Sequence, residues 1–251
     1  MGINYNPFSL EGKTILVTGA SSGIGRATAI ECSKMGATLI ITGRNAQRLQ
    51  ETYDALVGTG HKQIIADLAE QDGIDYLVAQ LPFLNGAVLC AGIGQTLPFQ
   101  FSTRKKFDKV FNINFFSPVE LLRLIFKQKI LAKKSSVVMI ASIGGVYGVS
   151  VGNCIYGATK SALNTIMKFC AKEFAPSRNI RVNCVCPGMV ETPLIRNETI
   201  SEEQYEKDKK RYPLQRYGKP DDIAYATIYL LSDAASWVTG QDIVIDGGVT
   251  V

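Results

Sequence analysis

The sequence predicts a single α/β domain built on a doubly wound parallel sheet with helices on both faces. Short apolar segments rich in β-branched residues alternate with longer helical segments along most of the chain. Such alternation produces right-handed crossovers and parallel strands that are covered on both sides. With 251 residues, of which 46% are hydrophobic, the chain is large enough to bury one sizeable core. We therefore treat residues 1–251 as one domain.

The expected elements follow one another in strand–helix order. Strands are expected at residues 13–18, 37–42, 63–66, 87–90, 136–141, 180–186 and 242–245. Helices are expected at residues 23–35, 46–57, 155–175 and 221–231, with two further long helices that end near Asn114 and Ala132. The polar segment 188–220 carries a charged helical stretch and has no place in the sheet. We predict that it is a substrate loop on the ligand side, at the carboxyl ends of the strands.

Composition and missing patterns exclude several classes of protein. The net charge is +5 without a run of five like charges, so we expect no nucleic-acid partner. No apolar stretch approaches the ~18 residues that span a membrane, and the start of the sequence lacks a signal-peptide pattern. With a single histidine, His61, and no C-x-x-C pair, we expect no metal site and no Ser-His-Asp hydrolase. We therefore expect a cytoplasmic protein without a membrane partner.

A glycine-rich turn, residues 18–25, joins the first strand to the first helix. Gly19 permits a tight turn, Gly23 removes a side chain where backbone approaches a pyrophosphate, and Gly25 lets the helix pack closely on the strand. The helix N-terminus then presents free N–H groups to phosphates. A glycine turn without a ligand is the alternative, but the position at the first strand–helix junction favours a dinucleotide. The predicted phosphate-binding residues are Gly19, Ser21, Ser22, Gly23, Ile24 and Gly25.

The end of the second strand indicates which dinucleotide binds. An acidic residue at this end is typical of NAD sites, and here the sequence has Arg44. Arginine pairs with a 2′-phosphate, which favours NADP(H) over NAD(H); the alternative is an exposed cation at a helix start. Asp67 is expected to accept a hydrogen bond from the adenine amino group or to cap the next helix. Further expected cofactor contacts are Leu68, Ala91 and Gly92.

Three side chains form a candidate catalytic group. Tyr156 and Lys160 are four residues apart at the start of a long expected helix, so they share one face. A nearby ammonium group lowers the pKa of a tyrosine, which makes the pair a plausible general acid/base for a carbonyl. Ser142 follows the preceding strand, where its hydroxyl is available to hydrogen-bond the reacting oxygen.

These motifs together resemble the short-chain dehydrogenase/reductase family. The likeness extends from about Gly12 to Gly248. It is carried by residues 18–25, Asn114, Ser142, residues 156–160, Asn183, residues 187–188 and the ending 239–248. The resemblance implies a Rossmann-type fold and an NAD(P)-dependent oxidoreductase that acts on CH-OH or C=O groups.

The resemblance also implies individual roles. Tyr156 would exchange the proton, Lys160 would bind the nicotinamide ribose and lower the tyrosine pKa, and Ser142 would position the carbonyl. Asn114 would anchor a water that relays protons to Lys160. Residues implied to border the nicotinamide and its phosphates are Pro187, Gly188, Val190 and Thr192. Members of the family are often homo-oligomers, so we expect a dimer or a homotetramer formed partly by helices near 115–132 and 155–175.

Two features depart from the family pattern. Leu89 and Cys90 stand where the family commonly has an asparagine pair that steadies the central strand and borders the adenosine. The stretch 67–90 also looks short, so a trimmed third helix is expected.

The expected activity is NADP(H)-dependent reduction of a ketone to a secondary alcohol. Residues 214–224 are similar to those of 3-oxoacyl-[acyl-carrier-protein] reductases, which makes a 3-oxoacyl thioester a candidate substrate. Lys133 and Arg178 fall near positions where those enzymes offer cations to an acidic carrier protein. One alternative is a dehydrogenase of a sugar, polyol or steroid alcohol. Another is a non-catalytic dinucleotide-binding sensor.

Overall fold

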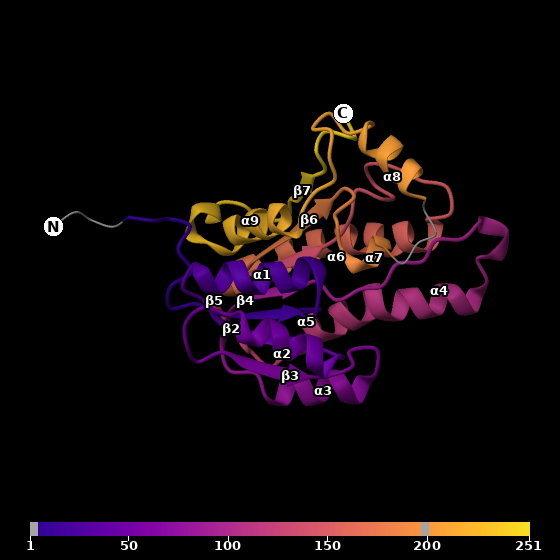
Figure 1. Ribbon diagram of the computed structural model, residues 1–251. Coiled ribbons are helices and arrows are strands. Elements are labelled where there is room, and N and C mark those ends of the chain that lie inside the picture. The colour runs from indigo at the N-terminus through magenta and orange to yellow at the C-terminus, as the bar shows by residue number, and fades with distance from the viewer. Residues whose placement is uncertain (1–4, 197–200) are drawn as a thin grey trace.

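The chain folds around one parallel sheet. The computed structural model describes residues 5–196 and 201–251 (Figure 1). Within these residues seven strands lie in the order β3-β2-β1-β4-β5-β6-β7, and every neighbouring pair is parallel. The strands are β1 (Thr14–Thr18), β2 (Thr38–Gly43), β3 (Lys62–Ile65), β4 (Leu84–Leu89), β5 (Leu131–Ile140), β6 (Arg181–Pro187) and β7 (Asp242–Ile245). The predicted doubly wound parallel sheet is confirmed.

Helices cover both faces of this sheet. The α-helices are α1 (Gly23–Lys34), α2 (Ala46–Asp54), α3 (Gln71–Ala79), α4 (Arg104–Phe111), α5 (Ser117–Lys127), α6 (Cys154–Arg178), α7 (Pro193–Arg196), α8 (Glu202–Lys209) and α9 (Pro220–Leu231). Short 3₁₀ turns occupy Phe99–Phe101 and Asp233–Ala235. None of the helices within the described residues is long and apolar enough to cross a membrane.

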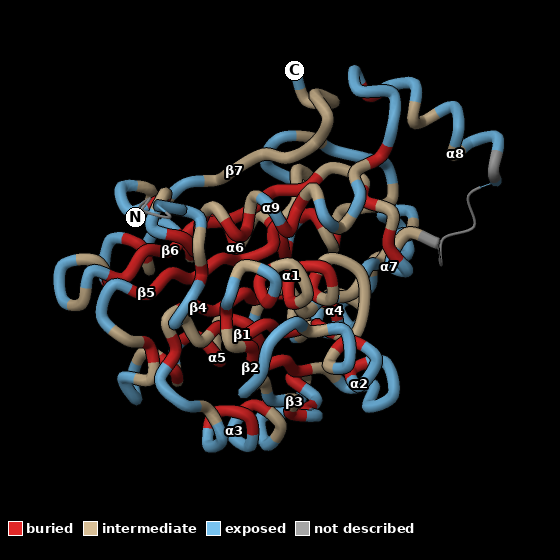
Figure 2. Tube along the Cα trace, turned by 60° about the vertical axis from the view of Figure 1, so that its left-hand side comes forward, coloured by how far each residue is buried: buried red, intermediate tan, exposed pale blue. Residues whose placement is uncertain are grey.

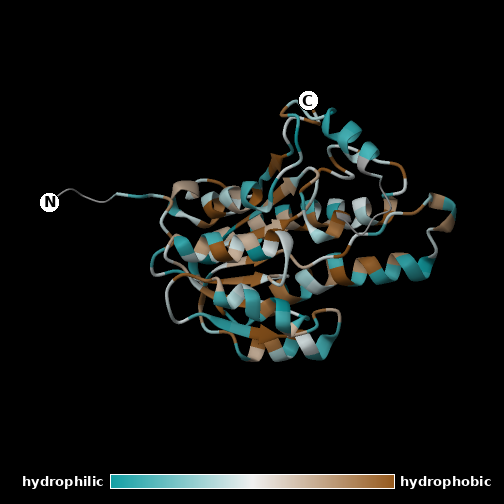
Figure 3. Cartoon of the chain, in the orientation of Figure 1, coloured by the Kyte–Doolittle hydropathy of each residue, from teal (hydrophilic) through white to brown (hydrophobic). Residues whose placement is uncertain are grey.

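Alternation along the strands divides the core into two clusters. On β1, Ile15 and Val17 pack on the side of α1, α2 and α9, whereas Leu16 packs on the side of α3, α5 and α6. All three side chains are fully buried, and burying each contributes roughly 1.5–3 kcal/mol. The central strands are accordingly buried in Figure 2 and hydrophobic in Figure 3, whereas α8 is largely exposed and hydrophilic. Residues buried on both sides are what a covered parallel sheet requires.

Two predicted boundaries around the fourth crossover are wrong. The second long helix ends at Lys127 and not near Ala132, because β5 begins at Leu131, five residues before the predicted strand. Leu131 is fully buried and pairs with Leu84, after which the register shifts at an irregularity. Lys129 turns the chain with a φ of 59°. This pairing joins residues that are far apart in sequence, so local periodicity does not indicate it.

The predicted helix end near Asn114 is also wrong. Helices α4 and α5 are joined by a π-turn, Asn112–Phe116, so the helical path continues through Asn114. The Ser117 hydroxyl donates to the carbonyl of Asn112 at 2.7 Å inside this turn. A π-turn accommodates one extra residue in a helix and often occurs at functional sites.

The region between β3 and β4 and the segment 188–220 agree with expectation. Helix α3 has nine residues, in keeping with the expected trimmed third helix. Helix α8 is the predicted charged stretch of the segment, and it begins with a capping box between Ser201 and Gln204. In Figure 1, α7 and α8 lie toward the right-hand end of the molecule together with α4. Residues 197–200 of the segment lie outside the described residues.

Candidate active site

A cavity of about 1230 Å³ lies at the carboxyl ends of the strands. Nearly all the residues predicted for catalysis or cofactor binding line it, although they come from distant parts of the chain. They are Gly19, Ser21, Ser22, Gly23, Ile24, Gly25, Arg44, Asp67, Leu68, Ala91, Gly92, Ser142, Tyr156, Lys160, Pro187, Gly188, Val190 and Thr192. Asn114 is the predicted site residue that does not line it. One continuous cavity therefore contacts both predicted groups of residues.

The glycine-rich turn is closely packed. Gly19 has a φ of +66°, and a side chain there would meet the Ala91 Cα at 2.9 Å. A Cβ on Gly25 would overlap the carbonyl group of Gly19. Ser22 is the N-cap of α1, but its side chain makes no capping hydrogen bond, and the first turn holds no acidic residue. The helix N-terminus therefore suits an anionic ligand such as a pyrophosphate.

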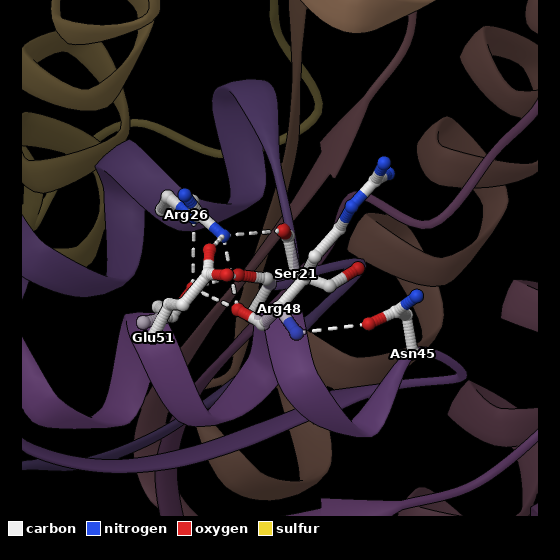
Figure 4. A network of polar contacts seen from close by, with 7 residues as sticks. Ser21, Arg26, Asn45, Arg48 and Glu51 are labelled. Atoms are coloured by element: carbon white, nitrogen blue, oxygen red, sulfur yellow. Dashed lines mark hydrogen bonds and ion pairs between the residues drawn. The ribbon is translucent and has the colours of Figure 1, made fainter.

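Arg26 clamps this turn to α2, an interaction that the sequence analysis missed. Its guanidinium donates to the carbonyl oxygens of Ser21 at 2.9 Å and Arg48 at 3.0 Å, and pairs with Glu51 at 2.9 Å (Figure 4). Its Nε donates to the Thr52 hydroxyl at 3.0 Å. The position of an arginine directly after Gly25 is a local signal, but three of its four partners, Arg48, Glu51 and Thr52, lie on the next helix.

Two arginines line the far end of the cavity. Arg44 is half-exposed and lies 3.8 Å from the Asp67 carboxylate. Arg48 is exposed, also lines the cavity, and its side chain extends away from Arg26 in Figure 4. Asn45 caps α2 by accepting from the Arg48 amide at 2.8 Å. Two cations against one carboxylate leave this end of the cavity net positive, and Arg48 was not predicted.

Asp67 does not cap the third helix. Its Oδ1 accepts from the Ala69 amide at 3.0 Å, which closes a short turn, while the N-cap of α3 is Glu70. The capping alternative is therefore wrong. The expected contact with adenine stays a prediction.

Leu89 and Cys90 replace the asparagine pair common in the family, and the turn after β4 is nevertheless held by hydrogen bonds. The Thr18 hydroxyl accepts from the amides of Cys90 at 3.0 Å and Ala91 at 3.1 Å, and donates to the Val88 carbonyl at 3.4 Å. Leu89 is buried in the core. Burial raises the pKa of the Cys90 thiol to about 11, with Lys160 acting in the opposite direction. Thr18 thus ties β4 to β1 without the asparagine pair, and Cys90 stays a neutral thiol.

Helix α6 presents the predicted catalytic pair to the cavity. Tyr156 lies in its first turn, and the Lys160 ammonium lies 5.6 Å from the centre of the Tyr156 ring. Lys160 is buried and donates to the Ile140 carbonyl at 2.7 Å. Burial lowers the pKa of Lys160. Ser142 follows β5, and its hydroxyl oxygen accepts from the Gly144 amide at 3.0 Å, which leaves the hydroxyl hydrogen available to another acceptor.

Asn114 lies behind this group, fully buried. Its Oδ1 accepts from the Ile93 amide at 2.8 Å, and its Nδ2 donates to the Ile93 carbonyl at 2.9 Å and to the Thr159 hydroxyl at 3.2 Å. The carboxamide therefore ties the segment after β4 to α6. A Cβ on Gly92 would lie 3.2 Å from Asn114 Oδ1 and 3.7 Å from Lys160 Nζ, so the glycine keeps the space between them open. The water-relay role stays a prediction.

The segment after β6 closes the cavity from the other side. Val190 and Thr192 are buried, and a Cβ on Gly23 would lie 3.1 Å from Thr192 Cγ2, so Thr192 covers the glycine-rich turn. The Met189 amide donates to the Tyr212 hydroxyl at 3.2 Å.

The outer part of the cavity is lined by the segment 188–220 and other loops. Met189, Leu194, Ile195 and Tyr212 give this part a partly apolar lining. Tyr205 does not line it; its ring packs on Tyr217 with centroids 4.8 Å apart. Lining residues that were not predicted include Val149, Val151, Gln204, Asp208, Arg211, Val249 and Thr250. They come from separate loops and from the end of the chain, and no spacing in the sequence links them.

His61 lies away from this cavity. Its Nδ1 accepts from the Leu39 amide at 3.0 Å, so its Nε2 carries the hydrogen that faces the Val57 carbonyl at 3.0 Å. The described residues contain no group of three or more His, Cys, Asp or Glu side chains arranged to hold a metal ion.

The chain is similar to known proteins over almost its entire length. The family described as Enoyl-(Acyl carrier protein) reductase matches residues 19–250. The 3-oxoacyl-[acyl-carrier-protein] reductase FabG of Thermotoga maritima is 34% identical over 249 residues, which cover 96% of this chain and 99% of the relative. A solved dehydrogenase/reductase from Sinorhizobium meliloti 1021 has a TM-score of 0.87 at 31% identity and covers 98% of both chains.

A second solved structure carries a nucleotide. It is a putative NAD(P)-dependent gluconate 5-dehydrogenase from Beutenbergia cavernae with bound NADP at low occupancy. Its TM-score is 0.84 at 31% identity, and the match covers 97% of this chain and 99% of that chain.

Proposed function

Because the chain belongs to the short-chain dehydrogenase/reductase family of NAD(P)-dependent oxidoreductases, we propose that it uses NADPH to reduce a ketone to a secondary alcohol. The observation that carries the proposal is that Tyr156, Lys160 and Ser142 line the same cavity as the glycine-rich turn. A dinucleotide held by that turn would share the cavity with the proposed acid/base.

The chemistry divides between the cofactor and three side chains. A bound nicotinamide supplies the hydride to the carbonyl carbon. The Tyr156 hydroxyl donates a proton to the carbonyl oxygen as negative charge develops there. The Ser142 hydroxyl hydrogen-bonds the same oxygen and orients it. The Lys160 ammonium beside the Tyr156 ring stabilises the phenolate that remains, which makes proton release easier.

The proposed cofactor preference depends on the far end of the cavity. Arg44 and Arg48 provide two guanidinium groups there, against the single carboxylate of Asp67. A 2′-phosphate is a dianion that guanidinium groups bind well, whereas a ribose diol gains little from them. The nucleotide bound in the structure from Beutenbergia cavernae is NADP, which is in keeping with this preference.

Two substrate classes are proposed in order. A 3-oxoacyl thioester comes first, because the relative from Thermotoga maritima is a 3-oxoacyl-[acyl-carrier-protein] reductase; an acyl carrier protein is then the proposed partner. A keto-sugar acid comes second, because a similar solved structure is a putative gluconate 5-dehydrogenase.

Cofactor binding and turnover of the purified protein test the proposal. NADPH and NADH are titrated by nicotinamide fluorescence, since the single tryptophan, Trp237, is 98% exposed and does not line the cavity. Acetoacetyl-CoA and 5-ketogluconate are then offered with the preferred nucleotide. Tight NADPH binding with oxidation of NADPH by acetoacetyl-CoA supports the proposal. Turnover of 5-ketogluconate alone favours the second class, and binding without turnover of any ketone contradicts reduction.

We also propose that the protein is a homo-oligomer. Phe116, at the end of the π-turn, and Phe169, on α6, are 56% and 61% exposed on the helices that the resemblance assigns to the interface. Light scattering coupled to size-exclusion chromatography gives the mass directly. A mass of 27.3 kDa at micromolar concentration would contradict the proposal.

A further inference from the structure

A polar clamp outside the cavity joins the glycine-rich turn to helix α2. The clamp consists of Arg26, Glu51 and Thr52, and none of these three residues lines the cavity. Thr52 is fully buried, whereas the side chains of Arg26 and Glu51 are 33% and 50% exposed. Since the clamp lies outside the space for a nucleotide, its effect on binding must pass through the groups that it holds.

Helix α2 depends on this clamp for its orientation. The helix has nine residues, and its buried residues are Leu49 and Thr52. The contact made by Leu49 is apolar and therefore non-directional. Hydrogen bonds, in contrast, have preferred distances and angles. The clamp therefore sets how α2 is rotated against the glycine-rich turn.

The clamp holds the backbone carbonyl groups of three residues. Arg26 Nη2 donates to the carbonyl oxygens of Ser21 at 2.9 Å and Arg48 at 3.0 Å. The Thr52 hydroxyl accepts from Arg26 Nε at 3.0 Å. The hydrogen of that hydroxyl faces the carbonyl oxygens of Ala20 at 2.9 Å and Arg48 at 3.1 Å. Both the turn and the start of α2 are thus held by the same pair of side chains.

Each held carbonyl fixes the direction of another group. A trans peptide unit points its C=O and its N–H to opposite sides, so holding the Ser21 carbonyl directs the Ser22 N–H away from Arg26. Ser22 lines the cavity and is the N-cap of α1. On α2, the Arg48 carbonyl faces Arg26, whereas the Arg48 side chain extends away from Arg26 and lines the cavity (Figure 4). The clamp therefore orients one amide and one guanidinium at the cavity.

The held part of the turn also contacts the end of β2. The Ala20 amide donates to the Thr42 carbonyl at 3.1 Å. A Cβ on Gly43 would lie 3.2 Å from Ser21 Oγ. Arg44 follows directly after Gly43. The clamped turn is therefore adjacent to the end of the cavity that is proposed for the 2′-phosphate.

We propose that Arg26 and Thr52 are positioning residues for the selection of NADPH: they hold the Ser22 amide and the Arg48 guanidinium in place for a 2′-phosphate. Neither residue contacts the nucleotide. Groups that are ordered before the ligand arrives bind it more tightly, because less conformational freedom is lost on binding. The inference rests on the proposed function, because it assumes the preference for NADPH given there.

The first test changes the geometry of the clamp and keeps its charge. Arg26→Lys replaces a planar guanidinium, which holds several acceptors at once, by a flexible point charge. We expect the NADPH Kd to rise about 10-fold and the NADH Kd by less than about 2-fold, because the positioned contacts to the 2′-phosphate are lost. Arg123→Lys is the matched control and should equal the wild type, since Arg123 pairs with Glu120 on α5 and does not line the cavity.

The second test removes a hydroxyl and no charge. Thr52→Val should raise the NADPH Kd about 3-fold, again with a smaller effect on NADH. Thr227→Val is its matched control, since Thr227 is also fully buried in a helix, donates to the Ile223 carbonyl at 2.8 Å and does not line the cavity. Both substitutions should lower Tm, and the NADPH Kd should change in Thr52→Val alone. Equal changes of the NADPH Kd in the two threonine variants would overturn the inference.

A double-mutant cycle tests whether the clamp acts through Arg48. In an Arg48→Ala background, Arg26→Lys should weaken NADPH binding by a smaller factor than in the wild type, because one of the groups that it positions is already missing. Full additivity of the two changes in binding free energy contradicts the inference.

Hydrogen exchange of the protein without nucleotide gives an independent readout. Amides of residues 20–23 and 46–52 should exchange faster in Arg26→Lys and in Thr52→Val, whereas those of β7 should not change. Unchanged exchange at residues 20–23 and 46–52 contradicts the inference alone. Equal affinity of the wild-type protein for NADPH and NADH contradicts the proposed cofactor preference, and the exchange rates then still decide whether the clamp orders the turn.

Discussion

The two halves of the cavity are built differently. The cofactor half consists of β1, α1, β2 and α2, joined by short turns, and Arg26 locks the glycine-rich turn to α2 with hydrogen bonds of 2.9–3.0 Å. The substrate half is formed by loops and by the segment 188–220, whose helix α8 is mostly exposed. The first half offers backbone groups in close packing, and the second offers side chains on separate loops. A rigid cofactor site can therefore be combined with a more adaptable ligand surface.

The largest effect that can test this division is a loss of catalytic turnover without a loss of NADPH binding. Tyr156→Phe removes the proposed proton donor but leaves the glycine-rich turn and the arginines intact. We expect kcat to fall by at least about 10³-fold, while the NADPH Kd remains close to that of the wild type. Steady-state kinetics and fluorescence titration measure the two quantities separately. Retained turnover would remove Tyr156 from the acid/base role.

Because it is closely packed, the cofactor half of the cavity should tolerate substitutions less well than the substrate half. In Gly25→Ala the new methyl group overlaps the Gly19 carbonyl, and we expect a loss of about 2 kcal/mol in the free energy of unfolding. Gly148→Ala is the matched change in the substrate half, where the nearest atom to the new Cβ is Thr250 Cγ2 at 3.9 Å. Urea denaturation compares the two variants. Equal destabilisation would contradict the contrast between the halves.

Cofactor choice should depend on side chains even in the cofactor half. Arg44→Ala and Arg48→Ala should each weaken NADPH binding about 10-fold, or about 1.4 kcal/mol, because each removes a charged partner of the 2′-phosphate. NADH binding should hardly change. Arg104→Ala is the control, since Arg104 pairs with Asp108 at 2.6 Å and does not line the cavity. Equal losses for NADPH and NADH would mean that neither arginine recognises the 2′-phosphate.

The smallest expected effect concerns pH and the substrate half. The hydrogen bond from Arg216 is the main cause of a lowered pKa of Asp222, which also accepts from the Lys219 amide at the start of α9. A carboxyl group with a lowered folded-state pKa stabilises the protein above its unfolded pKa of ~3.9, and this contribution is lost as the pH falls through the folded value. Asp222→Asn should thus lower the free energy of unfolding at pH 7 by less than about 1 kcal/mol, which gives a slightly lower Tm. The difference in Tm between the two proteins should be smaller at pH 3 than at pH 7, and a difference that stays constant would exclude this linkage.

The features that could be predicted from the sequence lie mainly in the cofactor half and in the catalytic pair. The glycine-rich turn, Arg44, and the Tyr156–Lys160 pair depend on local spacing, and their strands and helices lie close to where they were expected. The start of β5 depends on the pairing of Leu131 with Leu84, and the π-turn depends on Asn114 and Ile93, so both require knowledge of distant contacts. Arg48 was missed for this reason as well. Lining residues such as Val151 and Thr250 share no periodicity at all.

The π-turn Asn112–Phe116 restricts how the helical path of α4 and α5 can change in length. Each residue advances an α-helix by about 100°, so one extra residue sets the angular phase of α4 against that of α5. Removing one residue would restore uniform winding and relax the helix itself. It would also rotate the Asn114 carboxamide away from Ile93 and Thr159. The segment after β4 would then lose the hydrogen bonds that hold it to α6. The extra residue works as a spacer that sets the phase of two helices, and deletions there should be selected against even though the helix alone would favour them.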